Sequence, residues 1–393
     1  MLFYYYRDIC EDKFKKTMRN QAWLLCTVLC MAFSCSCKST QSKPVEQPVT
    51  IEKEPDTLTV AVVGDIMMGN TFPGNRLPAE DGKHIFDDVR DLLKTADITC
   101  GNLEGTIATS GKPRKNLGAP MAFMFMMPPR YTQHLLDAGF DFVGIANNHI
   151  YDFFEEAMTQ TEENLEKAGL GYAGAKDPKG QHPHREYCTK LFETPNGDTI
   201  LVGFSAFGHE DYSLRTRDTA TVRRIIKTLK EEKHCDIVIL SFHGGREGSA
   251  ARHLPYGSEM FYGDERGFLR DFAHFAIDCG ADIIYGHGPH VVRAIELYKD
   301  RFIAYSLGNF CTAGMGVGGL TGYAPLVRIR IDSDGKFIDG KIHSFLQQTM
   351  KGPKTDPNNL VAKEIATLTK EDVKDSKLSI AEDGTIKRKQ TDN

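Results

Sequence analysis

The chain has 393 residues, of which 41% are hydrophobic and 26% charged, and its formal net charge is −5. This length accommodates one large or two ordinary globular domains. The charge balance provides no basic surface of the kind that binds a phosphate backbone, so we expect no nucleic acid partner.

The first 37 residues have the pattern of a bacterial secretion signal. A basic flank precedes an apolar segment at 22–33 that is too short to span a bilayer comfortably. Small residues before Cys35 and Cys37 resemble a lipoprotein cleavage site, although Phe33 is bulky for that pattern. We expect residues 1–37 to direct export and to leave one of these two cysteines lipidated in a bacterial membrane. An ordinary secreted protein or an uncleaved anchor are the alternatives.

Three further segments follow the signal. Residues 38–56 are rich in Ser, Thr, Gln, Pro, Lys and Glu, and this composition predicts a flexible tether. Residues 57–350 carry the periodic patterns of a folded domain. Residues 351–393 lack such periodicity and are expected to form a peripheral C-terminal extension that is partly disordered, with a weakly ordered charged tail from Lys370.

Apolar and amphipathic segments alternate along the domain. The alternation predicts an α/β fold with its ligands at the carboxyl ends of the strands. Expected strands lie at 57–63, 97–100, 187–193, 199–204, 236–241, 281–285, 301–306, 326–331 and 340–345. Expected helices lie at 86–93, 131–139, 153–169, 221–233 and 267–279. The cysteines of the domain are odd in number and widely spaced, which is typical of buried hydrophobic residues and not of a disulfide framework.

Polar residues follow several of these apolar strands across a glycine or a single intervening residue. They are Asp65, Glu104, Asn148, His149, His243, His287 and His290. Each has a plain alternative, such as a structural histidine or, for Asn147 and Asn148, a helix cap. Together they are expected at one crevice, where carboxylates, a carboxamide and imidazoles suit Mn²⁺, Zn²⁺ or Fe. The donors suffice for one ion, or for two that share a carboxylate.

Six short motifs resemble those of the CapA family, the poly-γ-glutamate capsule biosynthesis proteins related to calcineurin-like metallophosphoesterases. The motifs are Gly64-Asp65-Ile66-Met67, Gly101-Asn102-Leu103-Glu104, Ala146-Asn147-Asn148-His149, Ser241-Phe242-His243-Gly244, Gly286-His287-Gly288-Pro289-His290 and Tyr305-Ser306-Leu307-Gly308-Asn309-Phe310. The resemblance covers residues 58–345 and implies a four-layer α/β/β/α sandwich of the metallophosphoesterase type, with metals at one edge of its two sheets.

The resemblance also implies roles for individual residues. Asp65 is expected to bind a first metal, Glu104 to bridge two metals, and His290 to complete the first site. A second metal is expected on Asn148, His243 and His287. His149 matches the histidine that assists the leaving group or a substrate oxygen, and Ser306 and Asn309 are expected to line the site and orient ligands. Asn147 is interpreted as a cap or an orienting residue.

Departures from the family pattern weaken the first metal site. Met67 stands where metallophosphoesterases have a histidine ligand, and Glu104 replaces a bridging aspartate. Gly245 and Gly288 stand where a tryptophan and a polar residue are frequent. One tight metal, or a metal acquired with the substrate, is therefore an alternative to a complete pair.

Two functions fit these observations. The first is a cell-envelope, metal-dependent hydrolase in capsule biosynthesis, acting on poly-γ-glutamate, a similar anionic polymer or a phosphoester. Arg246, Arg252 and His253 are its candidate substrate-binding residues, with a solvated loop face as the alternative. The second is a non-catalytic, membrane-anchored component that binds or exports the polymer. Membrane proteins of a capsule synthase are the expected partners of either.

Overall fold

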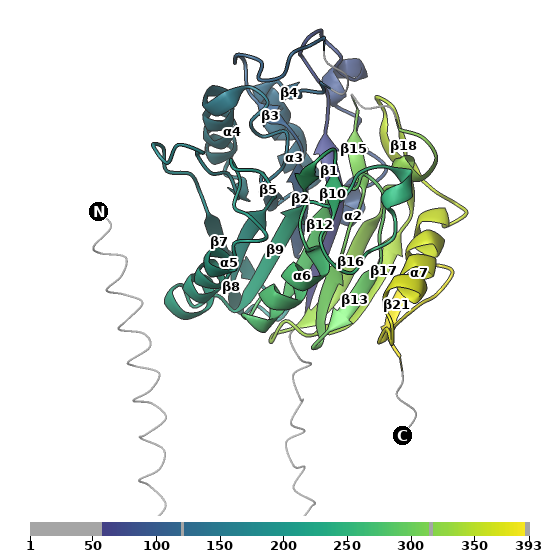
Figure 1. Ribbon diagram of the computed structural model, residues 1–393. Helices are drawn as coiled ribbons and strands as arrows, with labels where there is room; N and C mark the ends of the chain where they lie inside the picture. Colours follow the sequence, from purple (N-terminus) through teal and green to yellow (C-terminus); the bar gives the residue numbers. More distant parts are fainter. Residues whose placement is uncertain (1–56, 119–121, 314–316, 390–393) are drawn as a thin grey trace, which may run out of the picture. The chain divides into compact units, whose positions relative to one another are not determined.

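Two β-sheets lie face to face and helices cover their outer sides (Figure 1). The computed structural model describes residues 57–118, 122–313 and 317–389. The expected signal, the tether, Cys35 and Cys37 lie outside the described residues. No described helix combines the length and the apolar character that crossing a bilayer requires.

The first sheet has nine strands in the order β20-β21-β17-β16-β1-β2-β5-β6, and β15 also pairs with β1. Their bounds are β1 (Thr57–Met67), β2 (Ile98–Leu103), β5 (Phe142–Gly144), β6 (Gly171–Ala173), β15 (Asn309–Thr312), β16 (Leu326–Asp332), β17 (Phe337–His343), β20 (Leu378–Ile380) and β21 (Thr385–Arg388).

The second sheet has six strands in the order β13-β14-β12-β9-β8-β7. Their bounds are β7 (Tyr187–Glu193), β8 (Thr199–Phe207), β9 (Ile237–His243), β12 (Ile283–His287), β13 (Ile295–Tyr298) and β14 (Arg301–Ala304). Three small ladders complete the strands: β3 (Thr106–Ile107) with β4 (Met126–Met127), β10 (Met260–Phe261) with β11 (Asp264–Glu265), and β18 (Phe345–Gln348) with β19 (Gly352–Thr355).

The helices divide between the outer faces of the two sheets. Their bounds are α2 (Arg90–Lys94), α3 (Thr132–Ala138), α4 (Phe154–Ala168), α5 (Thr219–Lys227, continued by a π-helical turn to Glu232), α6 (Leu269–Asp278) and α7 (Leu360–Asp372). Helices α2, α3 and α4 share a core with the first sheet, and α5 and α6 share one with the second. The predicted α/β/β/α layering is therefore confirmed.

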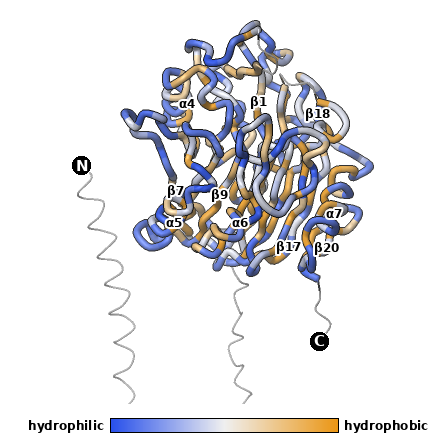
Figure 2. The backbone as a smooth tube through the Cα atoms, in the orientation of Figure 1, coloured by the Kyte–Doolittle hydropathy of each residue, from blue (hydrophilic) through white to orange (hydrophobic). Residues whose placement is uncertain are grey.

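Strand β1 shows why its sequence is apolar without interruption. Alternate side chains point to opposite faces, so Val62 packs between the sheets while Val63 packs against the helices. Both faces are buried, which is the condition that favours a continuous β-branched run. Between the sheets the rings of Phe142 and Phe204 stack with centroids 4.9 Å apart. Figure 2 shows the hydrophobic residues concentrated along these strands and hydrophilic residues along the loops.

The C-terminal segment differs from the expectation. Helix α7 buries Ile365 and Leu368 in the main core, and β21 pairs with β17 at the edge of the first sheet. The prediction of a weakly ordered tail from Lys370 is wrong for residues 370–389, and the folded unit continues past residue 350. The reason is that backbone pairing with an existing strand needs few apolar side chains, and Ile386 alone anchors β21 in the core.

Candidate metal centre

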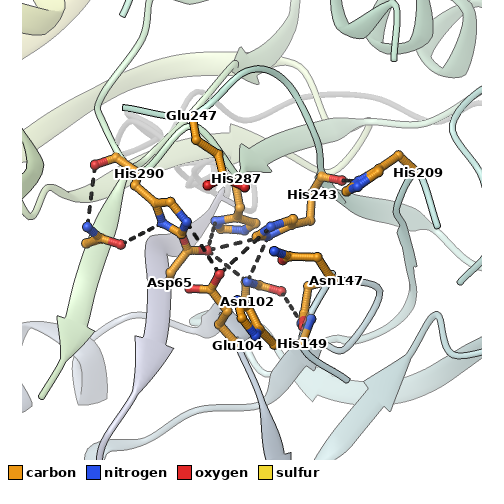
Figure 3. A network of polar contacts seen from close by, with 12 residues as sticks. Asp65, Asn102, Glu104, Asn147, His149, His209, His243, Glu247, His287 and His290 are labelled. Carbon is orange, nitrogen blue, oxygen red and sulfur yellow. Dashed lines mark hydrogen bonds and ion pairs between the residues drawn. The ribbon is translucent and has the colours of Figure 1, made fainter. Parts of the chain in front are cut away.

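Five of the six predicted metal ligands lie together in the structure. Asp65 lies near the end of β1, Glu104 directly after β2, His243 and His287 at the ends of β9 and β12, and His290 in the loop after β12 (Figure 3). His290 Nδ1 is 3.2 Å from Asp65 Oδ2, and His287 Nδ1 is 3.6 Å from Asp65 Oδ1. Glu104 Oε1 lies 3.9 Å from His243 Nε2 and 3.7 Å from His290 Nε2.

Parallel strand pairing produces this convergence. Strand β1 runs parallel to β2 and β15, with Asp65 opposite Asn102 and Asn309. Strand β9 runs parallel to β12, with His243 opposite His287. Because the carboxyl ends of parallel strands meet at one edge, side chains far apart in the sequence arrive at the same place.

Two glycines permit the close backbone approaches at this edge. Asp65 N donates to Gly308 O across 2.9 Å, and a Cβ on Gly64 would lie 2.1 Å from that same oxygen. Gly288 has a φ of +111°, and a Cβ there would lie 2.4 Å from Gly244 O. Only glycine fits such positions without displacing the backbone that carries the site.

Several buried polar atoms of the centre lack hydrogen-bond partners among the described residues. Asp65, Glu104 and His287 are fully buried. Both carboxylate oxygens of Glu104, both ring nitrogens of His287 and Nε2 of His243 have no hydrogen-bond partner among the described residues. A buried polar atom left unsatisfied costs about 1–3 kcal/mol, so a cluster of them indicates a missing ligand. One atom each from Asp65, Glu104 and His243 lie within 4.8 Å of one another, and these donors fit a divalent cation.

The pKa values of the centre fit the same conclusion. Burial and the Asp65 charge raise the pKa of Glu104 well above its ordinary value. Burial lowers the pKa of His287 to about 4, and burial with His290 lowers the pKa of His243 well below its usual range. Burial also acts to lower the pKa of His290, but Glu104 and Asp65 outweigh it and raise that pKa to about 10. His243 and His287 are thus held in the neutral form that binds a metal, whereas His290 carries a proton that it would release on binding one.

Three side-chain amides position the clustered carboxylates and histidines. Asn102 Nδ2 donates to Asp65 Oδ1 across 2.8 Å and lies 3.3 Å from His243 Nδ1. Asn147 Nδ2 donates to Asn102 Oδ1 and to Leu103 O. Asn309 Oδ1 lies 2.9 Å from His290 Nδ1, which places this side chain beside the centre. Such partners fix ring orientation and tune metal affinity.

The three residues of the segment 147–149 make different contacts. Asn147 Oδ1 accepts a hydrogen bond from His149 N, so this side chain stabilises the local turn. Asn148 has a buried Oδ1 with no hydrogen-bond partner among the described residues. His149 Nδ1 lies 2.7 Å from Asp152 Oδ2, and its ring packs on Phe125 at 4.3 Å. Burial lowers the pKa of His149, while the Asp152 carboxylate acts in the opposite direction.

A pocket of about 440 Å³ contains Asn148 and His149. The other lining residues are Arg114, Lys115, Phe123, Glu210, Glu247, Phe261, Tyr262, Asp264 and Arg266. Glu247 also belongs to the polar network of Figure 3 that includes the carboxylate–histidine cluster, so the pocket adjoins this cluster.

The predicted substrate-binding residues are placed differently. Arg252 Nη1 pairs with Glu364 across 2.8 Å and His253 Nδ1 with Asp372 across 3.0 Å, so both contact α7. Arg246 and His253 line a separate pocket of about 390 Å³. None of the three lines the pocket that contains His149, which corrects the expectation. The loop 246–253 was assigned to the site because it follows His243, but the chain turns toward the C-terminal helix.

Ser306 also has a different place from the one expected. Its Oγ donates to Val291 O across 2.7 Å and accepts from Gly308 N. Ser306 therefore stabilises the loop whose Gly308 carbonyl accepts the hydrogen bond from Asp65 N, and both contacts of its hydroxyl are with the backbone.

His209 and Asn102 belong to the site and were not predicted. His209 Nδ1 lies 3.4 Å from His243 O, and its Nε2 lies 3.2 Å from Glu210 Oε1. The sequence signal was present, because His209 follows β8 across Gly208 in the same pattern as the other site residues. It was missed because the expected strand ended at Phe204. Asn102 was hidden inside a strand, where a polar residue has no distinctive signature.

These features define a class: a two-sheet α/β protein with a buried carboxylate–histidine centre of metal-binding type at the strand ends. The chain belongs to the family described as "Bacterial capsule synthesis protein PGA_cap", whose sequence model matches residues 59–313.

The chain is similar to several named proteins and solved structures. It is 29% identical over 266 residues to the capsule biosynthesis protein CapA of Bacillus anthracis, covering 66% of this chain and 60% of that protein. It is 29% identical over 276 residues to the PGA biosynthesis protein CapA of Bacillus subtilis, covering 67% and 66%. The calcineurin-like phosphoesterase YfkN from Bacillus subtilis is 14% identical with a TM-score of 0.45, covering 81% of this chain and 98% of that chain.

Proposed function

We propose that this protein is a metal-dependent hydrolase of the cell envelope that acts on an anionic substrate in capsule biosynthesis. Poly-γ-glutamate, a similar polymer or a phosphoester is the substrate, and a lipidated Cys35 or Cys37 anchors the chain to the membrane. The observation that carries the proposal is the set of buried, unpartnered donor atoms beside a pocket lined by His149, whose Nδ1 contacts Asp152. Family membership supports the capsule context.

The proposal assigns the cation to the carboxylate–histidine cluster. The proposed ligands are Asp65, Glu104, Asn148, His243, His287 and His290, and the cluster holds one or two ions of Mn²⁺, Zn²⁺ or Fe. When bound, such an ion polarises a substrate oxygen and stabilises the negative charge that develops on it. The substrate enters from the pocket lined by Asn148 and His149.

His149 is the proposed proton-transfer residue. Its Nδ1–H donates to Asp152, which fixes the tautomer and leaves Nε2 for the substrate. Asp152 is itself held by Phe125 N at 2.9 Å and Lys115 Nζ at 3.0 Å, so the ring has a fixed orientation. In this tautomer Nε2 accepts a proton as a general base, and the imidazolium so formed can return that proton to the leaving group. A positioned imidazole of this kind contributes about 10²–10⁴-fold to the rate.

Metal content, thermal stability and hydrolysis test the proposal together. We expect the wild type to bind a divalent ion by elemental analysis and to gain about 2.7 kcal/mol of stability at 100 times the Kd. It should also release phosphate from a simple ester or cleave a γ-glutamyl polymer. Glu104→Ala should lose the ion, the stabilisation and the activity, whereas His149→Ala should lose activity and keep the ion.

The matched control is His182→Ala, because His182 is exposed and lies outside the pocket. It should behave as the wild type in all three measurements. A metal-loaded wild type that is inert on both substrates would contradict the proposal. A capsule phenotype that persists after loss of the metal would favour a non-catalytic, polymer-binding role.

A further inference from the structure

Three cationic side chains line the pocket beside the metal centre, and they differ in how far their charged groups are paired with other residues. Lys115 Nζ pairs with Asp152 across 3.0 Å and donates to Phe123 O across 2.7 Å. The guanidinium of Arg114 lies 5.0 Å from the centre of the Tyr212 ring, and Arg114 Nη2 donates to the Tyr212 hydroxyl across 3.1 Å. Among the described residues, no carboxylate forms an ion pair with Arg114.

Arg266 is buried and incompletely satisfied. It is 7% exposed, and its Nη2 donates to Glu247 Oε1 across 2.8 Å. Its Nε and Nη1 are buried without a hydrogen-bond partner among the described residues, and its guanidinium lies 5.2 Å from the centre of the Phe261 ring. A guanidinium stays protonated and has five N–H donors in a planar array, so unused donors at a pocket wall favour an oxyanion ligand.

Glu247 is occupied by Arg266, and Glu210 Oε1 contacts His209 Nε2 at 3.2 Å. Burial acts to raise the pKa of Glu210, but His209, Arg114 and Arg266 lower it, and among the described residues Glu210 forms no ion pair with either arginine. Asp264 is exposed on the β10–β11 hairpin. Arg114 and the free donors of Arg266 are therefore the positive groups that remain for a ligand.

We propose that Arg266 and Arg114 form an anion subsite that binds a carboxylate or phosphate group of the substrate, separate from the group held at the metal centre. The inference rests on the proposed function. Glu247 connects the two places, because it pairs with Arg266 and belongs to the polar network of Figure 3 together with His287 and His290. Phe123, Phe261 and Tyr262 add an aromatic wall to the same pocket. A substrate with a second oxyanion beyond its reacting bond, such as a chain of linked acidic residues, satisfies both places.

Calorimetric titration of the metal-loaded, full-length protein tests the subsite. Two probes are used separately: inorganic phosphate and a γ-linked glutamate oligomer. We expect Arg266→Gln and Arg114→Gln each to weaken binding by about tenfold to a hundredfold, the range for losing a charge-assisted hydrogen bond. Arg223→Gln is the control, because Arg223 lies exposed on α5 and stacks over Phe275. It should bind both probes as the wild type does.

The two probes also identify the source of the anion. Weaker binding of phosphate alone assigns the subsite to a phosphate group, and weaker binding of the oligomer alone assigns it to a carboxylate. Arg114 is exposed, so its variant keeps the test valid if loss of the buried Arg266 disturbs folding. Unchanged affinities in a folded Arg114→Gln variant with full metal content would overturn the subsite and leave the hydrolase proposal intact. Absence of metal from the wild type would instead overturn the hydrolase proposal.

Discussion

His149 Nδ1 lies 2.7 Å from Asp152 Oδ2, and the same carboxylate receives Phe125 N and Lys115 Nζ. Phe125 N and Lys115 Nζ therefore hold in place the carboxylate that orients the histidine. In the proposed mechanism this carboxylate selects the tautomer in which Nδ1 carries the hydrogen. Proton transfer and metal binding therefore depend on different residues, because Asp152 forms no described hydrogen bond with the clustered carboxylates and histidines.

Asp152→Asn should remove the tautomer control without removing the metal. We expect kcat to fall by about 10²–10⁴-fold, the contribution of a positioned general acid or base, with unchanged metal content. Steady-state kinetics and elemental analysis measure the two quantities. Asp278→Asn is the control, since Asp278 pairs with Lys299 on the surface. Full activity in Asp152→Asn would show that this pair has no role in the reaction.

Gly64→Ala should separate two segments that support Asp65. The new Cβ would lie 2.1 Å from Gly308 O and 2.6 Å from Leu307 O, so the backbone has to move. We expect a loss of about 1–3 kcal/mol in the free energy of unfolding, as for other overpacked sites, and weaker metal binding. Urea denaturation and metal titration report these effects. Gly74→Ala, where no atom lies within 4 Å, should change neither quantity, and equal behaviour of the two variants would refute the steric argument.

Leu368→Ala should show that α7 belongs to the folded core. Leu368 is fully buried, so removing its side chain should lower the free energy of unfolding by about 2–5 kcal/mol. Leu360→Ala in the same helix should change it by about 0.5 kcal/mol or less, because Leu360 is 40% exposed. Denaturant unfolding followed by circular dichroism distinguishes them. Similar small effects at both positions would mean that the C-terminal segment is peripheral after all.

His184 should make a pH-dependent contribution to stability. Its Nδ1 lies 2.6 Å from Glu162 Oε2 and its Nε2 lies 2.7 Å from Glu155 Oε1. Burial acts to lower the pKa of His184, but the two carboxylates outweigh it and the pKa is raised. A raised pKa in the folded state stabilises the protein below the unfolded pKa, and this stabilisation is lost as pH rises through the folded pKa.

The difference in unfolding free energy between the wild type and His184→Gln should therefore be largest at mildly acidic pH. It should shrink steadily as the solution is made alkaline. Thermal or denaturant unfolding over that range measures it, and taking the difference cancels titration elsewhere in the chain. The exposed His182→Gln variant is the control and should give a small difference. A difference that grows with pH would reverse the assigned sign.

The local sequence was sufficient for much of the fold. Apolar runs such as 57–63 and 236–241 predicted strands because both faces of these strands are buried and the signal is therefore continuous. Polar residues placed directly after such runs predicted the gathering of Asp65, Glu104 and three histidines, because parallel strands end at one edge of a sheet. These inferences depend on neighbours along the chain, which is why the sequence carries them.

The tertiary structure alone decided which loops reach the pocket. Arg252 and His253 follow a site histidine in sequence but contact α7, whereas Arg266 and Arg114 come from two distant loops and line the same cavity. Strand β21 likewise depends on pairing with β17, and its own residues give little indication of it. Contacts between distant segments are set by how the layers pack and where each loop returns. An apolar run locates a strand in the sequence, but packing determines what faces the end of that strand.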